Sequence, residues 1–87
     1  MAFLTEIELE EMKKRLNATT GGPWQSFIEG RDCESGSSFI RTFGNDLYLT
    51  GVSEADQDFI AASHQDIPKL IAEIARLRTL ISALEKK

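Results

Sequence analysis

The fold of this chain is decided by the stretch IPKLIAEIARLRTLISAL, residues 67–84. Its apolar residues recur at alternating spacings of three and four, with isoleucine at each heptad a position and leucine at each d position. They are Ile67, Leu70, Ile74, Leu77, Ile81 and Leu84. This order of β-branched and γ-branched residues favours a two-stranded parallel coiled coil. The stretch therefore predicts a long, coiled-coil-like C-terminal helix that pairs with a second copy of the chain or with a partner helix.

Other residues of the same helix bear on how it associates. Glu73 at a g position is placed to pair with Arg78 at the e position of a facing parallel helix. Ile71 at e and Leu80 at g widen the apolar stripe beyond a simple two-stranded seam. Because a core-facing helix of a compact domain shows a similar stripe, two interpretations stay open. One is self-association, with part of the widened face covered by the rest of the chain or a further subunit, and the other is burial within one chain.

Length and composition describe one small domain. The chain has 87 residues, with one cysteine and one histidine. A core of this size supplies only a few kcal/mol, so such folds often depend on disulfides, metals or oligomerisation. One cysteine excludes an internal disulfide and, with one histidine, an ordinary structural zinc site within one chain. We expect no metal, no cofactor and no enzymatic activity, and we expect a homo-oligomer.

The charge balance restricts the partners further. A formal net charge of −4 argues against non-specific duplex binding, which needs a basic surface to neutralise phosphates. No signal-peptide pattern opens the chain, and no apolar run approaches the roughly 20 residues of a membrane span. We therefore expect a cytoplasmic protein in a reducing compartment, without a membrane partner. Nucleic acid is a disfavoured partner, but the local basic run Lys13-Lys14-Arg15 keeps it from being excluded outright.

The N-terminal segment predicts an amphipathic helix. Thr5 and Glu8 match a capping box, and the helix should run from about residue 5 to residue 17. Its apolar stripe consists of Leu9, Met12 and Leu16. A stripe this narrow suits docking on a sheet.

Three short strands should follow this helix. β-rich segments at residues 24–29, 38–43 and 46–50 are separated by turn residues. The short turn Gly44-Asn45-Asp46 predicts an antiparallel hairpin between the last two segments. The polar, glycine-bearing loop of residues 30–37 should be the most mobile segment.

Ser53 should begin a second helix, and Pro68 bears on its end. Proline lacks an amide and disfavours a helical residue before it, so this helix should stop near Gln65. A continuous helix kinked at proline is the competing interpretation. The predicted fold is α+β, of order α-β-β-β-α-α, with a three-stranded antiparallel sheet covered on one face by the first two helices. Within this single domain, residues 1–66 form the body and residues 67–87 the oligomerisation helix.

The candidate ligand-binding residues are Trp24, Arg31, Arg41 and Tyr48. Strand alternation places Arg41 on the same face as Phe39 and Phe43, where an arginine beside aromatic rings can stack or bind a phosphate. Tyr48 joins this face if the register allows, although a solvated strand face is the commoner outcome. Trp24 is either a core anchor or a stacking surface, and the anchor is the commoner role.

The lone Cys33 and His64 lie far apart in the sequence, with no residue assigned to orient them. They therefore predict no nucleophilic pair.

Five motifs cover both ends of the chain and leave the strands between them variable. They are Arg15-Leu16-Asn17-Ala18-Thr19, Gly22-Pro23-Trp24, Ala55-Asp56-Gln57-Asp58-Phe59-Ile60-Ala61-Ala62-Ser63, Asp66-Ile67-Pro68-Lys69-Leu70 and Glu73-Ile74-Ala75-Arg76-Leu77-Arg78. Together they resemble a family of small proteins encoded by bacteriophages and prophages. Gly21-Gly22-Pro23 departs from the more usual proline-glycine-proline of that family, which should only loosen the turn.

The resemblance implies a phage-type accessory protein acting in the cytoplasm of a host bacterial cell, and it supplies no catalytic residues. Two functions follow from it. One is an oligomeric binder that blocks host defence, by sequestering a small anionic signal such as a cyclic nucleotide or by occupying a host protein. The alternative is a structural or regulatory adaptor that binds a host or phage protein through its last helix.

Overall fold

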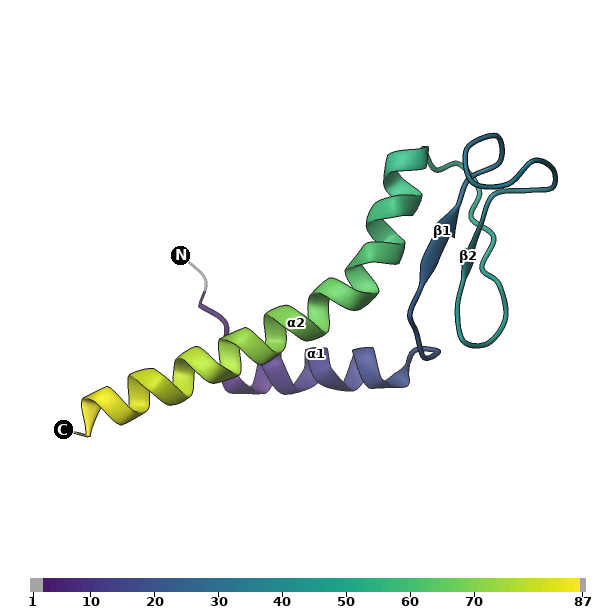
Figure 1. Cartoon of the computed structure of the whole chain (residues 1–87). Coiled ribbons are helices and arrows are strands. Elements are labelled where there is room, and N and C mark those ends of the chain that lie inside the picture. Colours follow the sequence, from purple (N-terminus) through teal and green to yellow (C-terminus); the bar gives the residue numbers. More distant parts are fainter. Residues whose placement is uncertain (1–2, 87) are drawn as a thin grey trace.

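The computed structural model describes residues 3–86. It contains α1 (Glu6–Ala18), β1 (Gln25–Phe27), β2 (Phe39–Arg41) and α2 (Glu54–Glu85), in that order (Figure 1). The α+β class is therefore confirmed. The molecule is elongated, measuring 60 × 22 × 21 Å with a radius of gyration of 17.2 Å, whereas a compact domain of this length has a radius of gyration of about 12 Å.

The first helix begins as the sequence predicts but docks elsewhere. The Thr5 hydroxyl accepts a hydrogen bond from the Glu8 amide, and the Glu8 carboxylate accepts one from the Thr5 amide. However, α1 packs antiparallel against the C-terminal half of α2 and not on the sheet (Figure 1). The expectation that both helices cover the sheet is wrong, because a sheet this small is already occupied by α2.

The sheet has two strands, not the three that the sequence predicts. β1 and β2 pair antiparallel, with Ser26 opposite Ile40 and Phe27 opposite Phe39. The segment expected as a third strand is reduced to a single bridge, in which the amides and carbonyls of Ile40 and Leu47 bond reciprocally at 2.8 Å. The cause lies at Thr42, whose hydroxyl donates to a carbonyl in the following turn and accepts an amide hydrogen bond there. This side chain competes with the strand ladder and ends it.

α2 runs unbroken through Pro68, so the stop predicted near Gln65 is wrong and the competing interpretation is confirmed. The helix bends midway along its length (Figure 1), as a proline in a helix interior dictates. Thr19, the C-cap of α1, contacts α2 before Pro68, at His64, and Glu6 of α1 contacts it after Pro68, at Arg78, so these contacts span the bend. The expected division between residues 66 and 67 thus falls inside α2.

The described residues bury few apolar side chains. Ile28 and Ile40 come from the strand region, Ala61 from the start of α2, and Leu9 and Ile71 from the contact between the two helices. The interior is therefore split into a small core beside the sheet and a smaller one between the helices.

Candidate functional site

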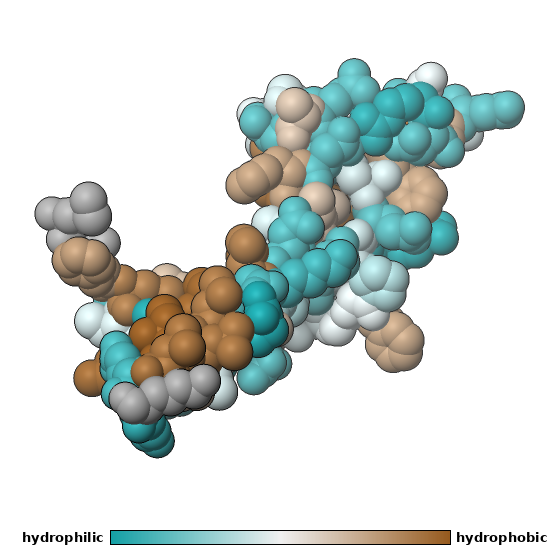
Figure 2. All heavy atoms as spheres, turned by 60° about the vertical axis from the view of Figure 1, so that its left-hand side comes forward, coloured by the Kyte–Doolittle hydropathy of each residue, from teal (hydrophilic) through white to brown (hydrophobic). Residues whose placement is uncertain are grey.

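The seam, defined as the six isoleucine and leucine residues of the heptad pattern, lies largely on the surface. Exposed fractions are 41% for Ile67, 60% for Leu70, 44% for Leu77, 54% for Ile81 and 66% for Leu84. Ile74 is half-buried. Figure 2 shows apolar atoms gathered at this end of the molecule, whereas the end that carries the sheet is mostly hydrophilic.

α1 covers one flank of the seam. Ile71, at heptad position e, is buried against it, and Arg78, also at e, donates to the Glu6 carboxylate at 2.8 Å and to the Leu4 carbonyl. Glu73 is engaged by Arg76 one turn further along. Glu73 and Arg78, expected to pair between facing helices, thus both have contacts within the chain, and the face that α1 leaves uncovered is that of positions a, d and g.

An apolar groove of about 570 Å³ adjoins the seam between α1 and α2. Its floor and walls are mostly apolar side chains of both helices: Leu4, Leu9, Met12, Leu16, Ile60, Ile67, Leu70, Ile71 and Ile74. Trp24, His64, Thr19, Ser63 and Arg15 complete the lining. α1 and the part of α2 that packs antiparallel to it form a helical hairpin, and we call the groove and the seam together the hairpin face.

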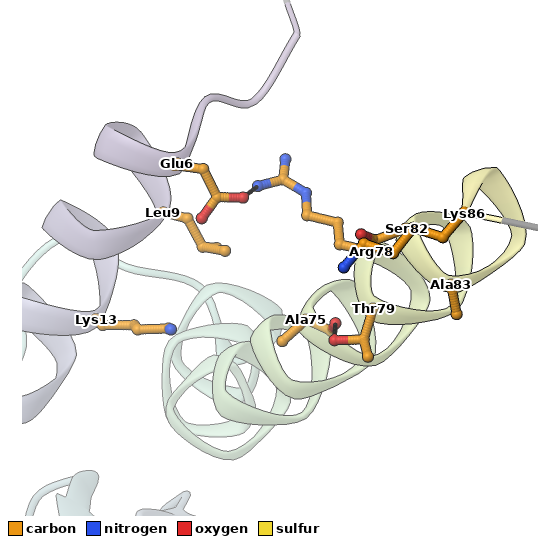
Figure 3. Close-up of a pocket in the computed structure, with 9 residues that line it drawn as sticks. All are labelled: Glu6, Leu9, Lys13, Ala75, Arg78, Thr79, Ser82, Ala83 and Lys86. Atoms are coloured by element: carbon orange, nitrogen blue, oxygen red, sulfur yellow. Dashed lines mark hydrogen bonds and ion pairs between the residues drawn. The ribbon is translucent and has the colours of Figure 1, made fainter.

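The opposite flank of the two helices carries a different hollow, of about 500 Å³ (Figure 3). It is lined by the charged groups of Glu6, Lys13 and Arg78 and by small side chains of α2. Leu9 contributes to both hollows. Along the C-terminal half of α2, the large exposed apolar side chains are thus gathered on one side, and charged and small ones on the other.

Trp24 closes the end of the groove and ties the chain to α2. Its ring stacks on His64 with centroids 4.2 Å apart and planes 3° from parallel, and its Nε1 donates to the Thr20 carbonyl at 3.0 Å. The side-chain amide of Gln65 bonds both the amide and the carbonyl of Trp24, at 2.8 and 2.9 Å. A Cβ on Gly22 would lie 3.0 Å from His64 Nδ1, so glycine is needed for this close approach. These contacts favour the anchoring role.

Arg31 is held by carboxylates. It forms a two-pronged pair with Asp58, at 2.8 and 3.0 Å, and donates to Asp32. The hydrogen bonds from Arg31, and next from Ser26, hold the pKa of Asp58 at about 2, below its ordinary 3.8. The hydrogen bonds to Asp58, and next to Asp32, in turn raise the pKa of Arg31. Arg31 therefore fixes its loop to α2, and its donors are already engaged.

Arg41 lies where strand alternation predicts, among aromatic rings. Its guanidinium carbon is 4.6 Å from the centroid of Phe27 and 6.0 Å from that of Phe39. The two phenylalanine rings stack at 5.1 Å, and Tyr48 lies 6.1 Å from Phe39. We call these four residues the aromatic platform. Within residues 3–86, the Arg41 side chain has no ion pair or hydrogen bond.

Phe27 belongs to this platform although sequence reasoning did not include it. Its signal was present, because an antiparallel pairing that sets Ser26 opposite Ile40 also sets Phe27 opposite Phe39. Phe43, expected on the same face, is 85% exposed beyond the point where the strand ends. The strand register therefore brings Phe27 into the platform, whereas the end of β2 at Arg41 leaves Phe43 out of it.

We also looked in the described part of the chain for metal ligands, a membrane span and a nucleophilic pair. Among residues 3–86, no group of three or more His, Cys, Asp or Glu side chains is arranged to hold a metal ion. No helix within that range is long and apolar enough to cross a membrane. His64 stacks on Trp24, and Cys33 lies half-buried in the loop that Arg31 fixes.

Comparisons of the chain with protein-family models, curated proteins and solved structures found no match. The hairpin face and the aromatic platform are therefore the features from which a function is argued.

Proposed function

We propose that the protein is a non-enzymatic binding protein that acts as a homo-oligomer assembled through its hairpin face. One observation carries this proposal: five of the six seam residues are more than 40% exposed, although their spacing is that of side chains that pack against another helix. They adjoin an apolar groove of about 570 Å³. Contiguous apolar surfaces of this kind are typical of protein association sites.

The surface area of the chain supports the same conclusion. The single chain exposes 6744 Å², whereas a compact monomer of 9.7 kDa exposes about 5,100 Å². The excess of about 1,600 Å² is larger than the roughly 800 Å² that each partner contributes to a standard interface. One additional subunit can therefore cover the hairpin face and supply burial that the small core lacks.

Light scattering coupled to size-exclusion chromatography tests this assembly. We expect the wild-type chain to elute as an oligomer and the double variant Leu77→Glu, Leu84→Glu to elute as a monomer, because charges without partners are costly to bury. Ile7→Glu is the matched control, since Ile7 is 73% exposed on the side of α1 away from α2. A monomeric wild-type chain would contradict the proposal.

The aromatic platform favours a second function, the binding of a small anionic nucleotide. The guanidinium carbon of Arg41 lies 4.6 Å from the ring centroid of Phe27 and 6.0 Å from that of Phe39, while its N–H groups have no acceptor within residues 3–86. An arginine so placed is preorganised for a phosphate, and the 65% exposed Tyr48 offers a ring on which a base can stack. We leave Arg31 out of this site because Asp58 and Asp32 already occupy its donors.

Calorimetric titration with cyclic dinucleotides, cyclic trinucleotides and ADP-ribose tests the platform. Arg41→Ala should abolish binding, while Arg76→Ala, which removes a surface arginine of α2, should leave it unchanged. The absence of heat with every nucleotide would refute this second function without affecting the first. Sequestering a nucleotide signal or occupying a host protein is the role that the resemblance to phage proteins implies for such a binder.

A further inference from the structure

We infer that the hairpin face is covered by a second copy of the chain packed antiparallel, so that the end of each α2 fills the groove of the other. This inference rests on the proposed homo-oligomeric function. It adds the orientation of the two copies, the register of the helices and the participation of α1. It also replaces the parallel pairing that the heptad pattern alone favours.

The C-terminal part of α2 extends beyond the start of α1. Arg78 meets the start of α1 at Glu6 and Leu4, yet α2 continues to Glu85, about 10 Å further at 1.5 Å per residue. Figure 1 shows this C-terminal segment extending past the first turn of α1. Its apolar side chains are exposed, with Leu80 at 48%, Ile81 at 54% and Leu84 at 66%. We call residues 79–86 the overhang.

The groove runs along the part of α2 that α1 covers, from Leu4 at the start of α1 to Trp24 and His64 at the far end. In its far part, Met12 and Leu16 form one wall, and Ile67 and Leu70 the other. One molecule therefore carries an apolar projection at one end and an apolar hollow that reaches the other end. Two such surfaces fit one another when the second copy is reversed.

The seam gives this arrangement a register. If Ile74 lies opposite Leu77 of the second copy, then Leu70 lies opposite Ile81, and Ile67 opposite Leu84. All six seam residues are then used, and every layer joins an a position to a d position. A parallel pairing would instead place groove against groove, leaving two hollows of about 570 Å³ facing each other, and such voids forfeit packing contacts.

Charge does not distinguish the two orientations, because the overhang ends in Glu85 and Lys86, whose charges are opposite. The assembly is a bundle of four helices, two from each chain.

Cysteine crosslinking tests the orientation. In a Cys33→Ser background, Leu70→Cys is introduced into one chain and Ile81→Cys into another, and the chains are studied alone and after refolding together. A disulfide forms only where the Cα atoms come within about 7 Å. We expect a covalent dimer in the mixture and none in either chain alone.

The outcomes separate the inference from the proposed function. Covalent dimers of Leu70→Cys with itself would show parallel packing and overturn the inference. A dimer by light scattering that forms no disulfide in any sample would overturn the register. A monomer by light scattering would overturn the proposed function itself.

Discussion

The two ends of the molecule differ in how much of their surface is buried by contacts within the chain. At the sheet end, formed by β1, β2 and the first turns of α2, Gln57 is 1% exposed and its amide nitrogen donates to Ser26 Oγ and to the carbonyls of Phe27 and Phe39. Ile40 beside it is fully buried. At the hairpin end, most of the seam faces solvent.

This difference indicates two sources of stability. The sheet end is closed by contacts within one chain, so its contribution should not depend on protein concentration. The hairpin end leaves its largest apolar surface exposed, so in the proposed homo-oligomer its contribution should rise with concentration. Substitutions at one end should therefore leave the other end intact.

Removing the buried amide should break the sheet end. Gln57→Ala deprives two backbone carbonyls of a donor in a buried setting, and we expect a loss of roughly 3–5 kcal/mol in the free energy of unfolding. Urea denaturation at fixed protein concentration measures it. Gln25→Ala, at an exposed site in β1, is the control and should change little. A Gln57→Ala loss below about 1 kcal/mol would contradict the account.

Removing Trp24, which contacts α2 between the two ends, should lower the free energy of unfolding. Trp24→Ala loses the stack on His64 and the bond to Thr20, and we expect a cost of about 3 kcal/mol. Trp24→Phe keeps a ring and should recover most of this loss. If thermal melts show Trp24→Ala to be as stable as the wild type, the residue is not an anchor.

Placing a charge in the groove should weaken assembly and leave the sheet end intact. We expect Met12→Glu to weaken dimerisation by about 2 kcal/mol, roughly 30-fold in the dissociation constant, because Met12 lies in the groove. Ile7→Glu introduces the same charge on the opposite side of α1. Sedimentation velocity compares the two, and equal dissociation constants would show that α1 takes no part in the interface.

Acid should release the loop from α2. The pKa of Asp58 is lowered to about 2 from 3.8 in the folded chain, so its pair with Arg31 stabilises the fold above the ordinary pKa and is lost as the pH falls toward 2. Asp58→Asn should therefore reduce the drop in melting temperature between pH 5 and pH 2. The control, Asp46→Asn, should leave that drop unchanged, and identical profiles for both variants would contradict the assignment.

The parts of the fold that the sequence predicts depend on neighbouring residues. The capping boxes at Thr5 and Ser53 involve residues three positions away, and strand alternation places Arg41 beside Phe39. Two parts are missed for different reasons. Pro68 disfavours a helix by local rules, but α2 continues through it, with contacts near both ends of α1 on either side of the bend. The hydroxyl of Thr42 bonds to Gly44 and Asn45, two and three positions away, and this local competition ends a strand that β propensity would extend.

The candidate sites divide in the same way. The seam is visible in the heptad pattern, but its covered flank is not, because Arg78 meets Glu6 across 72 positions of sequence. Arg31 resembles a free cation in sequence, and only folding brings Asp58 to it across 27 positions. The proposed orientation of a dimer rests on the groove and the overhang, which exist only once α1 and α2 have packed.

The central claim is that the hairpin face is buried against a second copy of the chain. Sedimentation equilibrium of the wild-type protein over a dilution series measures this directly. We predict a species of twice the 9.7 kDa chain mass, which dissociates on dilution together with a fall in the melting temperature. A mass of one chain at every concentration, with a constant melting temperature, would contradict it.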